Sequence, residues 1–226
     1  MAKAAFSKVT YTTLFADETI HPKYESALEK FEQELGRRYP MYIGDEEVWS
    51  EEVEFKHHSP IDTSIMVGTF QVGTRSHAKL AVATAKEAFP LWRKKRWQER
   101  VSIMNKAANL IDERKFDIAV AITYEVGKNR LEALAECWEA IDAIKFYSKI
   151  MKKNNGYVEK MVGAGPSEDC KVVSKPFGVW PVISPFNFPF MLSNGMALGA
   201  LITGNIAILK PTSEAPPNGS IAVQSV

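Results

Sequence analysis

Cysteine is scarce in this sequence. Its 226 residues include only Cys137 and Cys170, which are far apart and form no C-x-x-C pair. This spacing argues against a disulfide framework or a cysteine-rich zinc site, and it suits a reducing compartment. The N-terminal segment MAKAAFSKVTYTT lacks the apolar core of a signal peptide. We therefore expect a cytoplasmic protein without a bound metal.

Long apolar runs and an excess of one charge are also missing. The longest apolar run, around Met191–Ile202, is interrupted by Asn194, Gly195 and Gly199 and is too short to span a bilayer. The sequence has 28 Lys and Arg against 27 Asp and Glu, so no overall field attracts nucleic acid or an acidic membrane. We interpret the basic run RKKR at residues 93–96 as a solvated segment. Neither nucleic acid nor a membrane is expected as a partner.

Residues 1–155 are expected to be mainly helical, because their apolar residues recur at helical spacing. The predicted helices run from Pro22 to Leu35, from Ser76 to Ala88, through Val101 and Ile111, from Phe116 to a stop at Gly127, and through Leu131 and Ile141. Between the first two, YPMYIGDEEV predicts two short strands around Gly44, and SPIDTSIMVG predicts a turn and an edge strand.

Residues 156–177 predict a β-hairpin, and residues 178–226 predict one βαβ unit. GVWPVIS is a nearly continuous apolar run, typical of a parallel strand buried on both faces. A helix is expected over Phe190–Ile202, and IAILK predicts a second buried strand that ends at Lys210. The order strand, helix, strand indicates an α/β fold with a right-handed crossover.

Polar loops follow both predicted strands, SPFNFP after the first and KPTSEAP after the second. In open α/β sheets ligands bind beyond the carboxyl ends of the strands, so the two loops predict a cleft. Asn187, held between two prolines, can donate a hydrogen bond to an oxyanion, and Lys210 can bind a phosphate or a ribose hydroxyl. A turn asparagine and a surface lysine are the alternatives. No G-x-G-x-x-G or P-loop motif is present.

The segment VISPFNFP, followed by TGNIAILKPTSEAP, resembles the paired motifs of the NAD(P)-dependent aldehyde dehydrogenase superfamily. YPMYIGDEEV and EVGKNRLEALAE are most similar to the Δ1-pyrroline-5-carboxylate (glutamate semialdehyde) dehydrogenase branch, and the resemblance extends from about Tyr24 to Pro216. It implies the N-terminal part of the aldehyde dehydrogenase fold. That part is an incomplete Rossmann-like nucleotide-binding domain with a helical N-terminal portion and a β-hairpin used for oligomerisation.

The resemblance also implies roles for individual residues. Asn187 matches the asparagine that stabilises the oxyanion of the thiohemiacetal, and Lys210 matches the lysine that binds the adenosine ribose. Ser213 stands where NAD-preferring relatives often have glutamate, so both NAD and NADP should be tolerated. Four further positions match residues that line the cofactor cleft: Ile183, Ser184, Pro185 and Phe186.

The family's nucleophilic cysteine and general-base glutamate belong to its second half, and we expect this chain to lack them and to be inactive alone. Cys137, in a helix, and Cys170, in the hairpin, are not expected to replace the nucleophile. The expected partner is a second copy or a longer aldehyde dehydrogenase chain. A non-catalytic interaction or regulatory partner of a full-length enzyme, and a nucleotide-binding module without chemistry, remain alternatives.

Two clusters of titratable residues are interpreted as ordinary surface. His57 and His58 are adjacent in a strand, where neighbouring side chains point to opposite faces and cannot share a metal. Glu132, Glu136 and Glu139 follow one another at helical spacing and are expected to form a solvated face.

Overall fold

The structure is a computed structural model that describes residues 18–50 and 54–216. Its helices are α2 (Ile20–Glu32), α3 (Arg75–Trp92), α4 (Trp97–Val126), α5 (Arg130–Lys153) and α6 (Pro189–Ile202). Its strands are β1 (Arg37–Tyr39), β2 (Met41–Ile43), β3 (Glu46–Val48), β4 (Glu54–His58), β5 (Met66–Gln71), β6 (Val158–Met161), β7 (Cys170–Val173), β8 (Val179–Ile183) and β9 (Ile206–Lys210). No helix in these ranges is long and apolar enough to cross a membrane.

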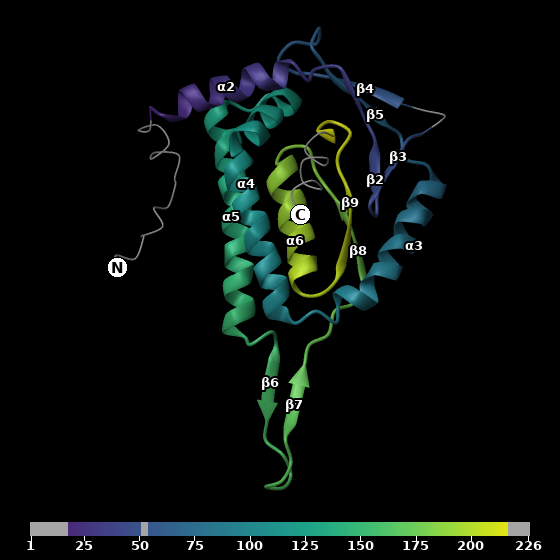
Figure 1. Ribbon diagram of the computed structural model, residues 1–226, viewed down its shortest axis with the longest axis vertical. Coiled ribbons are helices and arrows are strands. Elements are labelled where there is room, and N and C mark those ends of the chain that lie inside the picture. Colours follow the sequence, from purple (N-terminus) through teal and green to yellow (C-terminus); the bar gives the residue numbers. More distant parts are fainter. Residues whose placement is uncertain (1–17, 51–53, 217–226) are drawn as a thin grey trace.

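The long helices α4 and α5 lie side by side, with α6 packed against them (Figure 1). Their facing sides supply most of the buried core, including Met104, Ile118, Leu134 and Ile144. Two separate helices were predicted where α4 is continuous. That prediction is wrong, because the polar stretch DERK lacks the glycine or proline that would break a helix. The helix ends at Gly127, as predicted, with φ of +72°.

The other predicted helices are confirmed with shifted ends. Helix α3 begins one residue before Ser76, and its N-cap is Thr74, whose side chain accepts a hydrogen bond from the His77 main chain. The predicted strands around Gly44 are the antiparallel pair β2–β3. The prediction of an edge strand in SPIDTSIMVG is wrong, because β5 lies in the centre of the sheet β1-β5-β4 and buries Val67 and Phe70.

The hairpin β6–β7 is confirmed and extends away from the helices at the end of α5 (Figure 1). Gly156, at the turn before β6, has φ of +67°. A Cβ at this position would lie 2.1 Å from Cδ1 of Trp97, so only glycine allows the hairpin base to approach α4 this closely. The direction of the hairpin is thus fixed where it leaves the helices.

The βαβ unit is confirmed: β8 and β9 pair in parallel, and α6 connects them. The predicted burial of β8 on both faces is wrong, because the side chains of Trp180 and Ile183 are 45% and 71% exposed. Strand β8 has a single hydrogen-bonded neighbour, β9, in the described ranges. One face of the pair packs against α6, and the opposite face is covered only in part by α3.

Candidate functional site

The two predicted loops meet at the carboxyl ends of β8 and β9. Ile183 is paired with Lys210 in the strand register, and the Ser184 main-chain N–H donates to the Lys210 carbonyl over 3.1 Å. This bond joins the start of the SPFNFP loop to the start of the KPTSEAP loop. The predicted juxtaposition of the two loops is therefore present in the fold.

Most candidate side chains at this edge are exposed. Ile183 and Phe186 expose 71% and 59% of their surface, and Asn187, Lys210 and Ser213 are exposed as well. Together they form an open ledge of two apolar and three polar side chains. Such a ledge offers contacts to one side of a ligand only. Pro185 is half-buried.

Ser184 differs from its neighbours because its side chain is buried. Its Oγ lies 2.5 Å from Oγ of Ser193 and 3.4 Å from the Pro189 carbonyl, both in α6. The hydroxyl therefore ties the loop to the helix that follows, and only the main chain of Ser184 is left for a ligand. Sequence reasoning gave no sign of this bond, since Ser193 reaches Ser184 only after the chain turns back.

Glu136 is the functional-site neighbour that sequence reasoning missed. The prediction of a solvated acidic face is wrong for this residue, whose side chain is fully buried while Glu132 is exposed. Its carboxylate accepts hydrogen bonds from the main chain at the start of α6 and pairs with Lys128. The available signal was its place between Ala133 and Ala140 on the buried stripe of α5.

The loop after β9 is ordered by a local hydrogen bond. The buried hydroxyl of Thr212 donates to the carboxylate of Glu214. This bond lowers the pKa of Glu214, and a main-chain bond and the nearby Lys210 charge act in the same direction. A carboxylate that stays ionised thus follows Ser213 at the site.

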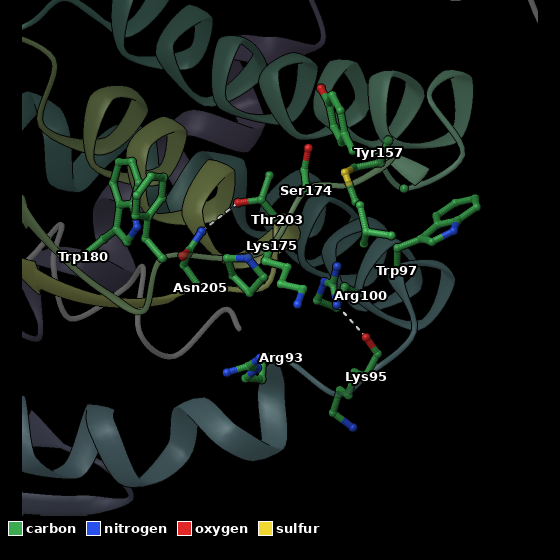
Figure 2. Close-up of a pocket in the computed structure, with 15 residues that line it drawn as sticks. Arg93, Lys95, Trp97, Arg100, Tyr157, Ser174, Lys175, Trp180, Thr203 and Asn205 are labelled. Carbon is green, nitrogen blue, oxygen red and sulfur yellow. Dashed lines mark hydrogen bonds between the residues drawn. The ribbon is translucent and has the colours of Figure 1, made fainter. Parts of the chain in front are cut away.

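A cavity of about 510 Å³ lies elsewhere (Figure 2). It is at the amino end of the β8–β9 pair, beside Trp180 and Asn205, and none of the candidate site residues lines it. Four cationic side chains surround it: Arg93, Lys95, Arg100 and Lys175. Open α/β sheets place ligands at the carboxyl ends of their strands, so the ends of β8 and β9 are the candidate site. The cavity nevertheless supplies a competing site that an experiment must distinguish.

Neither cysteine is placed where it could act as a nucleophile at the candidate site. Cys137 is fully buried, and its thiol donates to the Ala133 carbonyl over 3.4 Å. Burial raises its pKa well above the usual value, which disfavours the reactive thiolate. Cys170 lies in β7 of the hairpin, which extends away from the carboxyl ends of β8 and β9 (Figure 1).

The two adjacent histidines, His57 and His58, differ in burial. His57 is half-buried, and burial lowers its pKa, whereas His58 is exposed and lies 2.9 Å from the Thr63 carbonyl. His57 is therefore less exposed than His58 within the surface pair that the sequence suggested. Within residues 18–50 and 54–216, no group of three or more His, Cys, Asp and Glu side chains could hold a metal ion.

The model of the aldehyde dehydrogenase family matches residues 48–226. The chain belongs to this family. It is 35% identical over 204 residues to the 1-pyrroline-5-carboxylate dehydrogenase of Geobacillus sp. (strain WCH70), covering 90% of this chain and 39% of that protein. The 1-pyrroline-5-carboxylate dehydrogenase 1 of Halalkalibacterium halodurans is also 35% identical, over 205 residues, with 90% of this chain and 39% of that protein covered.

Solved structures agree with this assignment. The 1-pyrroline-5-carboxylate dehydrogenase from Thermus with bound NAD superposes with a TM-score of 0.89 at 33% identity, covering 100% of this chain and 43% of that one. The lactaldehyde dehydrogenase from Escherichia coli gives 0.77 at 26% identity, covering 84% and 40%. The fold is therefore the N-terminal part of the aldehyde dehydrogenase fold, as the resemblance implied. The chain spans about two fifths of the length of the curated relatives it matches.

Proposed function

We propose that this chain carries the oxyanion donor and part of the cofactor cleft of an NAD(P)-dependent aldehyde dehydrogenase. The proposed reaction is the oxidation of glutamate semialdehyde, the open form of 1-pyrroline-5-carboxylate, to glutamate. The observation that carries the proposal is the bond between Ser184 and Lys210, which joins two exposed polar loops at one sheet edge. The similarity to 1-pyrroline-5-carboxylate dehydrogenases supports the choice of aldehyde.

Asn187 is proposed as the oxyanion donor. Its side chain is exposed at the turn that leads into α6 and is available to a substrate. An amide N–H aimed at the oxygen of an aldehyde under attack stabilises the negative charge that develops there. Donors of this kind contribute about 2.7–4 kcal/mol to the transition state of acyl transfer.

Lys210 and its neighbours fit one side of a nucleotide cofactor. The Lys210 ammonium can donate to ribose hydroxyls, and Ile183 and Phe186 offer exposed apolar surface to a flat base. Ser213 brings no carboxylate that would repel a 2′-phosphate, although Glu214 is next to it. NAD(P), when bound, supplies the acceptor for the hydride from the aldehyde carbon.

Catalytic turnover is not proposed for this polypeptide by itself. Cys137 is buried with a raised pKa, and Cys170 is in the hairpin. Purified chain given 1-pyrroline-5-carboxylate and NAD or NADP should therefore produce no increase in absorbance at 340 nm. Turnover that disappears in Cys137→Ala or Cys170→Ala would contradict this.

Cofactor binding provides the direct test of the proposed site. We expect millimolar affinity at best, because the ledge contacts one side of the ligand and about 1.4 kcal/mol of lost contacts weakens binding tenfold. In an NMR titration, NAD and NADP should shift the amide signals of Ser184 and Lys210, and NADP should bind no more weakly than NAD. Lys210→Ala should weaken both cofactors about tenfold.

Lys175→Ala is the matched control, since it removes a lysine from the cationic cavity at the opposite end of the strands. It should leave both affinities unchanged. If Lys175→Ala weakens binding and Lys210→Ala does not, the nucleotide occupies the cavity and the proposed site is wrong.

The hairpin supports an additional proposal about assembly. Four apolar side chains of the hairpin expose from 48% to 98% of their surface: Met161 in β6, Val162 directly after it, and Val172 and Val173 in β7. Strands β6 and β7 pair only with each other within the described residues, so each strand also has an unpaired edge, and such edges invite pairing with another chain. We propose that residues 156–177 form an oligomerisation unit, between residues 1–155 and 178–226, that pairs with a second copy or a longer aldehyde dehydrogenase. A monodisperse monomer by light scattering at high concentration would contradict this.

A further inference from the structure

The buried carboxylate of Glu136 joins three parts of the chain next to the proposed oxyanion donor. Its Oε1 accepts hydrogen bonds from the main-chain N–H groups of Phe190, over 2.8 Å, and Met191, over 3.0 Å. Its Oε2 lies 2.5 Å from Nζ of Lys128. The Glu136 side chain is fully buried, and that of Lys128 is 14% exposed.

The first turn of α6 needs such an acceptor. The first N–H groups of a helix have no partner within the helix and are usually satisfied by a polar N-cap side chain. The N-cap of α6 is Phe188, which has no polar side chain, and Pro189 follows at the start of the helix. Glu136 supplies the missing acceptor from α5, and its negative charge suits the positive end of the helix dipole.

Lys128 contacts the same turn from another direction. Its ammonium lies 3.5 Å from the centre of the Phe188 ring, close enough for a cation–π contact. The ion pair thus contacts the chain at Phe188 through the ring and at Phe190 and Met191 through the amides. Asn187 immediately precedes this segment.

We propose that Glu136, with Lys128, is a positioning residue that sets the orientation of Asn187. The catalytic meaning of that orientation rests on the proposed function, but the positioning itself does not. The pair fixes the segment from Phe188 to Met191, and the Ser184 hydroxyl fixes the other side of the loop. Asn187 is held between these two attachments with its own side chain free to face a substrate.

The geometry of the two carboxylate oxygens defines informative variants. Glu136→Gln keeps an oxygen for the two amides but places an NH₂ group against the Lys128 ammonium, so two donors face each other. The double variant Glu136→Gln/Lys128→Met removes that conflict and retains the acceptor. Glu136→Ala removes every contact. Glu132→Gln, an exposed change one turn earlier in α5, is the matched control.

The experiment is NMR on the full chain without cofactor or aldehyde. Hydrogen exchange is measured at the amides of Phe190 and Met191, and selective ¹⁵N labelling follows the side-chain amides of Asn187 and Asn205. Asn205 is the internal reference, because it is buried beyond the other end of α6 and bonded to Ala200 and Thr203. A readout without ligands keeps a failure of this proposal separate from a failure of the proposed function.

In Glu136→Ala, exchange at the two amides should become at least tenfold faster, which corresponds to about 1.4 kcal/mol. The Asn187 signals should move and lose their single environment, while Asn205 stays unchanged. Glu136→Gln should show the same pattern, and the double variant should restore most of the protection. Glu132→Gln should match the unsubstituted chain.

Two results would overturn the proposal. In the first, the Phe190 and Met191 amides lose protection while the Asn187 signals stay in place, so that the cap does not orient the asparagine. In the second, Asn187 and Asn205 change together in every variant, so that Glu136 supports only the fold. If Glu136→Ala does not fold, the single and double Gln variants decide between these results.

Discussion

The two ends of α6 are both held by side chains from distant helices, with opposite charge. At the amino end the Glu136 carboxylate accepts two main-chain N–H bonds. At the carboxyl end the Arg100 guanidinium donates through Nε to the Ile202 carbonyl over 2.9 Å, and Trp92 donates to the Leu201 carbonyl over 2.9 Å. Each charge has the sign that the adjacent end of the helix dipole favours.

The segments that adjoin the two ends of α6 differ in burial. After the carboxyl end, Gly204 and Asn205 are buried in a turn, and Asn205 also accepts a hydrogen bond from the Gly178 main chain. Before the amino end, Phe186 and Asn187 are exposed. The comparison shows how similar anchoring can serve two purposes. One end is closed to connect the strands, and the other leaves a single polar side chain at a fixed place on the surface.

Arg100→Ala should give the largest change in stability. It leaves the buried Ile202 carbonyl without its donor and also removes the bond from Nη1 to the Lys95 carbonyl, so we expect a loss of about 3 kcal/mol. Urea denaturation measures this loss. Lys106→Ala, an exposed cation on the same helix, should change stability by less than about 0.5 kcal/mol. Equal urea midpoints for Arg100→Ala and Lys106→Ala would show that Arg100 does not hold the carboxyl end of α6.

Trp92→Phe should have a smaller effect at the same end. The Leu201 carbonyl also accepts the Gly204 main-chain N–H over 2.9 Å, so it keeps a partner when the indole donor is lost. We expect a loss of about 1 kcal/mol in thermal or urea unfolding. Leu91→Ala, at a neighbouring residue with 74% of its surface exposed, serves as the control. A loss as large as that of Arg100→Ala would mean that the second acceptor bond does not compensate.

Asn187→Ala should change stability least, by less than about 0.5 kcal/mol, because its exposed side chain makes no hydrogen bond within the described part of the chain. Unfolding by urea, measured beside Arg100→Ala, tests this. A large loss would show that the asparagine supports the turn and is not held ready for a ligand. The difference between the ends of α6 would then disappear.

The sequence was sufficient for the features that depend on local pattern. The apolar runs of β8 and β9, separated by the helix 189–202, predicted the βαβ unit, and the strand-end rule predicted that Ser184 and Lys210 would be neighbours. The interruption predicted within α4 failed because charged residues such as Asp112 and Glu113 can continue a helix when they face solvent.

Features that depend on distant partners could not be predicted. Glu132 and Glu136 are one turn apart on α5 and look alike in periodicity. Only the arrival of α6, 54 residues later in the chain, buries Glu136 and leaves Glu132 exposed. The exposure of Trp180 in β8 has the same origin, since the burial of a strand face is decided by neighbours and not by the apolar character of the strand itself.

Helix α5 sets the distance between the hairpin and the turn that contains Asn187. Gly156 under the Trp97 ring fixes the hairpin where α5 ends, and Glu136 fixes the turn from within the same helix. At 1.5 Å per residue, the stretch from Glu136 to Lys153 is about 26 Å long. A partner bound to the hairpin therefore lies at a set offset from Asn187, determined by one rigid rod and not by a flexible linker.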